Sequence, residues 1–235
     1  MLKLSYISLS LLMLIILFLI GNYAIQKSIS SQQDHASKKR ILLSSLLLWH
    51  LYILAIGSTQ FLTDLSFPPR IALFLIIPTF LFIGFFIRKN WKKNWIQSIP
   101  SIWLVLYQSF RIAIESIFIF TVAAGLLHKN VTIKGYNYDM LYAISAIFIA
   151  IIVHYSTTLP KKLLLAWNFL GLAVIAVIIF LFLSSIYFPE LYGPNTAAFP
   201  TEFGKYPYVL VPGFLMPSAV FIHALSIAQL MNIRK

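Results

Sequence analysis

Three polar side chains that could bind a ligand or move a proton lie in one long hydrophobic stretch, residues 101–127. Gln108, Arg111 and Glu115 are separated by three and then four residues, so on an α-helix they share one narrow face. A charged side chain in the middle of a bilayer costs about 2.5–3.5 kcal/mol on the insertion scale, and such residues face the interior of a bundle. We therefore predict that this face, the polar stripe, points inward.

The polar stripe is compatible with several functions, and residue types alone leave them open. An arginine with free donors suits a carboxylate or phosphate, and a glutamate near histidines suits proton exchange. We therefore predict binding or transport of a small polar or anionic solute. The alternatives are a membrane-embedded enzyme or haem-type redox protein, a non-catalytic subunit that docks a partner helix, and a structural network in which Arg111 and Glu115 neutralise each other.

Polar residues of other hydrophobic runs lie at depths from which they could reach the polar stripe. At a rise of about 1.5 Å per residue, Arg111, His50 and His223 all fall near the middle of the bilayer. Tyr138 and Asp139 precede a further run and would stand near the entrance, although Asp139 is more typical of a helix N-cap. The predicted ligand-binding residues are Arg111, Glu115, Gln108, His223, Asn168, His50, Asp139 and Tyr138.

Signatures of catalysis and of cofactor binding are sparse in this sequence. Neither a Gly-x-Ser-x-Gly nor a His-Glu-x-x-His motif occurs, and the lack of cysteine excludes disulfides, thiol nucleophiles and thiolate metal ligands. A haem between His50 and His223 is the sharpest cofactor hypothesis, because axial ligation requires matched depth on two helices. We otherwise expect no cofactor and no metal.

Composition places the chain in a membrane. With 60% hydrophobic and 10% charged residues, it has too little polar sequence to cover a water-soluble globule. The net charge of +12 does not predict nucleic-acid binding, because the basic residues fall in short clusters between apolar runs. The expected partners are the lipid bilayer and a small solute, with a protein partner or a homo-oligomer left open.

Seven hydrophobic runs are long enough to cross a bilayer, for which a helix needs about 20 apolar residues. We predict an all-α polytopic bundle of seven transmembrane helices that forms a single domain, residues 1–235. The first run is interpreted as a retained helix, because its apolar core exceeds the roughly 7–15 residues of a signal peptide. The predicted helices are 4–25, 41–62, 71–88, 101–127, 141–157, 163–186 and 212–231.

Basic residues set the expected orientation. They gather after the odd-numbered runs, so the positive-inside bias places the amino terminus outside and the carboxyl terminus in the cytoplasm. The same boundary carries Trp91, Trp95, Trp103 and Trp167, as an interfacial aromatic belt does. The predicted cytoplasmic residues are Lys27, Lys38, Lys39, Arg40, Arg88, Lys89, Lys92, Lys93, Lys161, Lys162, Arg234 and Lys235; Lys3, Arg70, Lys129, Lys134 and Lys205 lie on the other side.

Prolines, glycines and one long connection refine this arrangement. Pro78 and Pro217 lie inside apolar runs and are expected to kink their helices, while Gly171 and Gly213 permit close helix approach. The outer loop, residues 187–211, is rich in proline and aromatic residues. It predicts either an ordered cap over the outer mouth of the bundle or a loop lying at the membrane interface.

Four segments in the last 135 residues resemble an uncharacterised family of bacterial multi-pass membrane proteins: FRIAIESIFIF, VTIKGYNYDMLYAISA, LLLAWNFLGL and YPYVLVPGFLMPSAVFIHALSIAQL. The resemblance implies seven helices in a bacterial inner membrane and implies no activity. It gives weight to Arg111, Glu115, Gly135, Asn137, Asp139, Trp167, Asn168, Pro212, Pro217 and His223.

Overall fold

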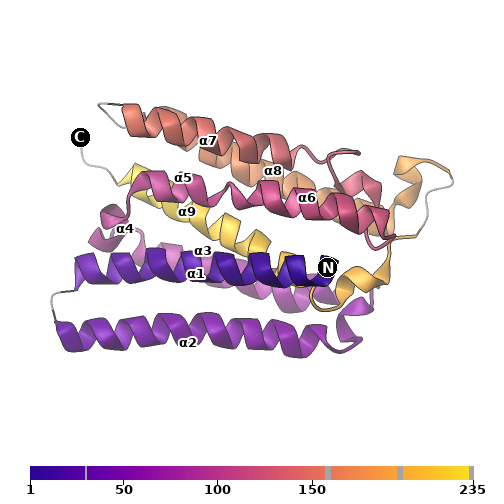
Figure 1. Cartoon of the computed structure of the whole chain (residues 1–235), viewed down its shortest axis with the longest axis horizontal. Coiled ribbons are helices and arrows are strands. Elements are labelled where there is room, and N and C mark those ends of the chain that lie inside the picture. Colours follow the sequence, from indigo (N-terminus) through magenta and orange to yellow (C-terminus); the bar gives the residue numbers. More distant parts are fainter. Residues whose placement is uncertain (30, 157–159, 195–197, 233–235) are drawn as a thin grey trace.

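The computed structural model describes residues 1–29, 31–156, 160–194 and 198–232. Every regular element in these ranges is helical, and the long helices lie side by side in one bundle (Figure 1). Six helical segments are long and apolar enough to cross a membrane. They are α1 (Leu2–Ser28), α2 (Gln32–Gly57), η2 with α3 (Ala72–Ile76, Ile77–Asn90), α5 with α6 (Ser101–Tyr107, Phe110–Ala123), α8 (Lys161–Tyr187) and η6 with α9 (Val211–Leu215, Met216–Met231).

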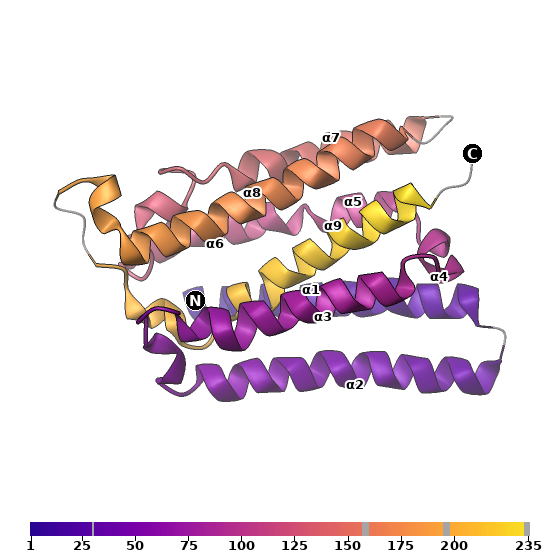
Figure 2. The same ribbon diagram turned by 180° about the vertical axis from the view of Figure 1, so that it is seen from behind.

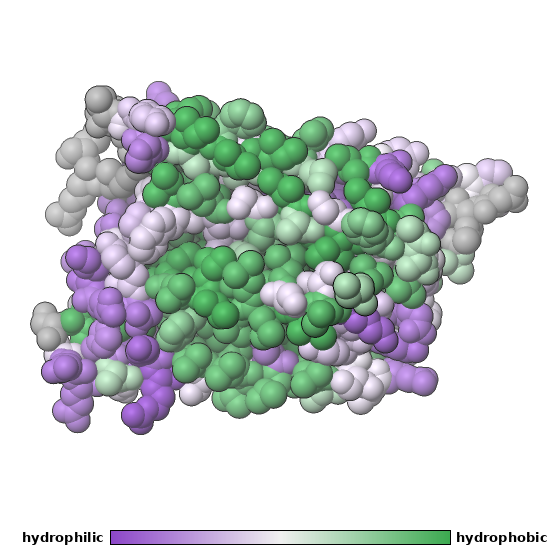
Figure 3. All heavy atoms as spheres, viewed as in Figure 1, coloured by the Kyte–Doolittle hydropathy of each residue, from purple (hydrophilic) through white to green (hydrophobic). Residues whose placement is uncertain are grey.

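The predicted all-helical membrane bundle is therefore confirmed in its class. The fifth predicted helix corresponds to α7 (Asp139–Tyr155), whose 17 residues make it shorter than the other six. A green apolar band occupies the middle of the molecule in Figure 3, between two hydrophilic ends. That distribution is what a protein embedded in a bilayer presents to its surroundings.

Two predicted helices differ from the observed ones by more than three residues: 41–62, where α2 spans Gln32–Gly57, and 101–127, where α6 ends at Ala123. Helix α2 begins at Gln32 rather than at residue 41, because the Ser31 hydroxyl caps it by accepting the Asp34 N–H at 3.4 Å. Helix α6 ends at Ala123 rather than at residue 127. Gly125 follows it at φ 71°, and the Leu126 N–H donates to the Thr121 carbonyl at 3.0 Å, which together form a Schellman motif.

The two ends of the bundle have different character. The basic end carries the junction of α1 with α2, the end of α3, and the short helix α4 (Asn94–Ser98). The loop end carries the connections 58–71, 124–138 and 188–210, with the short helices η1 (Phe61–Thr63), η3 (Lys129–Val131), η4 (Pro189–Tyr192) and η5 (Thr201–Gly204). Arg234, Lys235 and residues 157 and 195–197, to which the sequence-based predictions refer, lie outside the described residues.

Prolines in two helices leave carbonyl groups without an intrahelical donor. Pro78 and Pro217 have no N–H, so the carbonyls four residues earlier lose their α-helical partner, and each proline directly follows a π-helical segment, η2 or η6. Aromatic side chains of α2 supply the missing donors. The Trp49 indole N–H donates to the Gly213 carbonyl at 2.8 Å, and a second donor of α2, the Tyr52 hydroxyl, donates to the Phe74 carbonyl at 3.2 Å.

The close approaches predicted at two glycines are confirmed. A Cβ at Gly213 would lie 3.0 Å from Ile53 of α2, and one at Gly171 would overlap Tyr142 and His223. Figure 2 shows α9 running diagonally through the bundle, with α2 on its periphery. The polar residues of α9 are therefore enclosed by other helices.

We predict that Trp49→Phe lowers the free energy of unfolding by about 1–3 kcal/mol, because it leaves the buried Gly213 carbonyl without a donor. Adding Pro217→Ala should recover part of this loss, since residue 217 then has its own N–H. Thermal unfolding in detergent measures both variants. Trp103→Phe, at a tryptophan that is 38% exposed, is the control, and equal stability of the single and double variants would contradict the assignment.

Candidate functional site

A buried ion pair lies at the centre of the polar residues. The Arg111 Nη2 of α6 contacts the Asp139 Oδ1 at the start of α7, and the two side chains are only 3% and 5% exposed. The predicted N-cap role of Asp139 is wrong, because Asp139 is the first helical residue and Tyr138 holds the cap position. The Asn137 Oδ1 instead accepts the Asp139 N–H at 2.9 Å. The Asp139 carboxylate is thereby left to face the arginine, and the first turn of a helix favours its negative charge.

Arg111 has two further partners. Its Nη1 lies 3.3 Å from the His223 Nε2 of α9, and its guanidinium lies 4.7 Å from the centre of the Tyr142 ring, a cation–π distance. Because the His223 Nε2 accepts from a guanidinium, the imidazole is neutral and its Nδ1 carries the hydrogen. That Nδ1 donates to the Asn168 Oδ1 at 2.9 Å.

Asn168 continues the hydrogen-bonded chain on α8. Its Nδ2 donates to the Leu164 carbonyl at 2.7 Å and to the Ser226 Oγ at 3.0 Å. Helix α8 reaches this position because Gly171, one turn later, has no side chain to collide with His223. Four elements, α6, α7, α8 and α9, thus share one buried polar network.

Glu115 belongs to the same network but does not pair with Arg111. Its Oε1 accepts the Asn137 Nδ2 at 2.7 Å, and the same Nδ2 lies 3.1 Å from the Val131 carbonyl. Its Oε2 is buried and has no hydrogen-bond partner among the described residues. The structural alternative in which Arg111 and Glu115 neutralise each other is therefore wrong in its pairing, since Asp139 holds that place.

The helix that carries the polar stripe is interrupted beside it. The Gln108 N–H donates to the Val105 carbonyl at 3.1 Å, and the Arg111 N–H donates to the Gln108 carbonyl at 3.2 Å; both bonds span three residues rather than four. The Gln108 Nε2 reaches across to the Ala219 carbonyl of α9 at 3.1 Å. Helices α5 and α6 are thus joined by a short 3₁₀ turn that precedes the ion pair, and Gln108 and Ser109 in this turn keep right-handed helical backbone angles.

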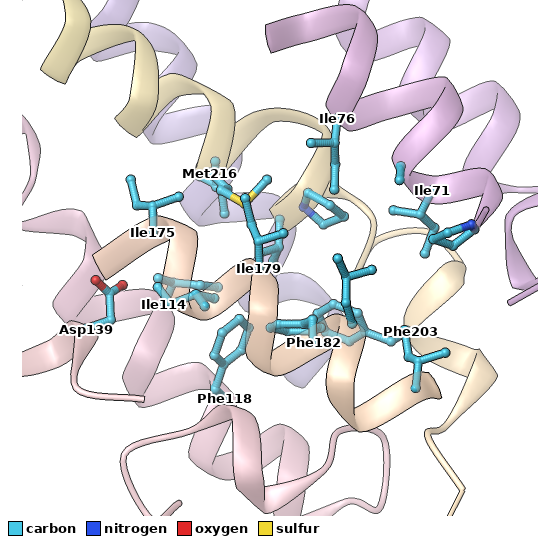
Figure 4. A pocket seen from close by; sticks show the side chains of 18 of the residues that line it. Ile71, Ile76, Ile114, Phe118, Asp139, Ile175, Ile179, Phe182, Phe203 and Met216 are labelled. Carbon is cyan, nitrogen blue, oxygen red and sulfur yellow. The ribbon is translucent and has the colours of Figure 1, made fainter. Parts of the chain in front are cut away.

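A cavity of about 120 Å³ adjoins the ion pair and Glu115. Figure 4 shows the Asp139 carboxyl group at one end and Ile71 and Phe203 toward the other. Arg111, Glu115 and Asp139 supply its charged lining. The rest comes from apolar residues of α6, α8, α9, η2, η5 and η6 and of the two connections 58–71 and 188–210. The cavity is therefore amphipathic, with one charged end and an apolar body.

The loop end closes over this cavity with aromatic side chains. Phe203 of η5 lies 5.5 Å from Phe182, 6.1 Å from Tyr208 and 6.2 Å from Phe118, between ring centres. Gly204 sits against the backbone of the 58–71 connection, where a Cβ would lie 2.7 Å from the Leu62 carbonyl oxygen. In the described part of residues 187–211, Phe199 and Phe203 are buried at the loop end; that this end is the outer mouth of the bundle stays a prediction.

The structure brings together six of the eight predicted residues: Arg111, Glu115, Gln108, His223, Asn168 and Asp139. Tyr138 stays apart with an exposed side chain. His50 also stays apart, on α2, where its ring nitrogens lie 3.2 Å from the Ser10 Oγ and 3.0 Å from the Leu46 carbonyl. A haem between His50 and His223 would have to displace hydrogen-bond partners from both imidazoles.

The predicted ligand-binding residues omit two members of the site, Asn137 and Tyr142, of which only Asn137 receives weight from the family resemblance. Asn137 bridges Glu115 and Asp139, although its position in a turn-like segment predicts only loop chemistry. Tyr142 lies one turn after Asp139, on the face of α7 that meets Arg111. The i, i+3 spacing of Asp139 and Tyr142 is the signal that could have found it.

Comparison with known protein families, with curated proteins and with solved structures finds no match for this chain. The site is therefore interpreted from its own geometry.

We predict that Asp139→Ala lowers the free energy of unfolding by about 3–5 kcal/mol, because it leaves the Arg111 charge buried without a counter-charge. The adjacent exposed residue gives the control, Tyr138→Ala, which should change stability little. The double variant Arg111→Met with Asp139→Leu should be more stable than Asp139→Ala. Chemical or thermal unfolding in detergent measures all three, and a double variant no more stable than Asp139→Ala would contradict the ion pair's role.

Proposed function

We propose that this chain is a membrane protein that binds a small amphipathic molecule inside the bilayer. The apolar body of the ligand occupies the cavity between α6, α8, α9 and η2, and its polar group meets Glu115. One observation carries the proposal: the Glu115 Oε2 is buried and has no hydrogen-bond partner among the described residues, and Glu115 lines a cavity whose other lining residues, apart from Arg111 and Asp139, are apolar. An unpaired carboxylate is costly to bury, so a proton or a ligand donor completes it.

The charges of the side chains around the cavity limit which polar group the ligand can carry. A free arginine would suit the anionic solute predicted from the sequence, but Arg111 has its counter-charge in Asp139, and His223 is neutral. The remaining acidic group of the cavity lining is the Glu115 carboxyl. An amine or a hydroxyl group therefore fits this end better than a carboxylate does.

The surroundings of the cavity support ligand exchange. Two π-helical segments, η2 and η6, contribute to its wall, and π-helical turns are frequent at functional sites. The aromatic cap at the loop end covers it. We propose that ligand enters between the cap and η2.

Transport of the same ligand is a second candidate. The observation that favours it is the 3₁₀ turn between α5 and α6, an irregularity of the helix beside the charges of a kind that often marks a functional hinge. Movement of labelled octylamine into proteoliposomes, compared between wild type and Glu115→Gln, distinguishes transport from binding.

The membrane and topology belong to this proposal as well. We propose a bacterial inner membrane, seven crossings with α7 as the fifth, an outer amino terminus and a cytoplasmic carboxyl terminus. Figure 1 supports the odd number, since α1 begins at the loop end and α9 ends at the basic end. The basic residues of α3 support a cytoplasmic basic end.

We predict that octylamine and octanol raise the melting temperature of the detergent-purified protein and that octanoate does not. A ligand at a hundred times its dissociation constant stabilises the folded state by about 2.7 kcal/mol. Glu115→Gln should abolish the preference for the amine while the protein stays folded. Ala72→Phe, which fills the apolar part of the cavity, should abolish the response to both compounds.

The control for this screen is Glu190→Gln, the same chemical change at an exposed loop residue. It should respond as wild type does. Preferential stabilisation by octanoate, or equal responses of wild type and Glu115→Gln, would overturn the proposal. If no compound acts and Glu115→Gln only melts earlier, Glu115 is structural and the proposal fails.

A further inference from the structure

A second hollow lies at the basic end, far from Glu115 along the bundle. This basic groove, of about 750 Å³, is formed where the end of α3 meets α9. Its rim carries four cations, Arg88, Lys89, Lys92 and Lys93, all exposed. Figure 2 shows α3 and α9 side by side near α4 at this end.

Among the described residues, no carboxylate pairs with these cations. The ion pairs found among the described residues join Arg70 with Asp64, Arg111 with Asp139, and Lys205 with Glu202. Of the chain's six acidic residues, Asp34 alone lies at the basic end, in the first turn of α2. The described residues therefore leave the cations of the groove available to an anionic group of another molecule.

The floor of the groove is apolar and reaches into the bundle's hydrophobic band. Ile83, Gly84 and Ile87 of α3 and Ala224 of α9 line it, and Trp91 lies beside the cations. Gly84 leaves open space, since a Cβ there would meet nothing within 4 Å. Cations at headgroup depth can contact the phosphate of a phospholipid, and the apolar floor beside them can contact one of its acyl chains.

We propose that the basic groove is a binding site for an anionic phospholipid of the surrounding leaflet. Its phosphate contacts the cations of the rim, where Arg88 can donate two parallel hydrogen bonds to phosphate oxygens. One acyl chain lies over Gly84 between α3 and α9. A free phosphate ion would use the rim but not the floor, so the shape of the groove favours the lipid.

Two charge variants of equal size test this proposal. The groove variant changes Arg88, Lys89, Lys92 and Lys93 to glutamine, and the control changes Lys27, Lys38, Lys39 and Arg40, at the same end but outside the groove. Native mass spectrometry titrates each with phosphatidylglycerol and with phosphatidylcholine. The groove variant should bind phosphatidylglycerol at least about tenfold more weakly than wild type, given roughly 1 kcal/mol per cation, and the control should stay near wild type.

A steric variant separates a lipid from free phosphate. Gly84→Leu fills the open floor without changing any charge, and leucine is compatible with the helix. It should weaken phosphatidylglycerol binding, and inorganic phosphate should not compete with the lipid. Equal losses in both charge variants, unchanged binding by Gly84→Leu, or competition by phosphate would each overturn the proposal.

Discussion

The ion pair between Arg111 and Asp139 is the interaction on which the rest of this structure depends. An unpaired guanidinium at this depth would carry a large desolvation penalty, so its counter-charge must arrive from another helix. Asp139 can serve because α7 starts where α6 presents Arg111, and the Asn137 side chain takes over the capping of that start. The connection 124–138 therefore has to end at a fixed depth. His223 and Tyr142 then fill the remaining faces of the guanidinium, which fixes α9 against α6 and α7.

The second constraint is that backbone groups in an apolar medium need partners of their own. Pro78 and Pro217 break this rule within their helices, and α2 repairs both breaks with aromatic donors. This repair explains why α2, although mostly exposed along its length, is held against η2 and η6. It also places two irregular helical turns in the wall of the cavity without leaving their carbonyls unsatisfied. The irregular backbone beside the site is thus stabilised from the opposite side of the bundle.

The fold and the site could be predicted from the sequence to different extents. Periodicity and length predict an all-helical membrane bundle and the inward face of Gln108, Arg111 and Glu115, because both depend on local spacing. The partner of Arg111 could not be predicted in this way. Glu115 is the acidic residue nearest to Arg111 in the sequence, whereas Asp139 is the acidic residue that contacts it in the structure. Which of the two forms the ion pair depends on how the helices are arranged in the bundle. The predicted place of His50 in the site is wrong for the same reason, because two residues at equal depth on different helices need not be neighbours.

Both proposed sites follow from polar groups for which the described residues provide no partner. In the network around Arg111, most polar atoms are hydrogen-bonded within the bundle, as buried groups in folded proteins are. A network with a purely structural role would have no need for a second carboxylate, because Asp139 already balances the arginine. Glu115 adds a carboxyl group that this balance does not require, and its Oε2 has no hydrogen-bond partner among the described residues, in a side chain that lines a cavity. The basic groove repeats this logic at the membrane boundary, where its cations meet no carboxylate of the described chain and the bilayer itself offers anionic groups at the required depth.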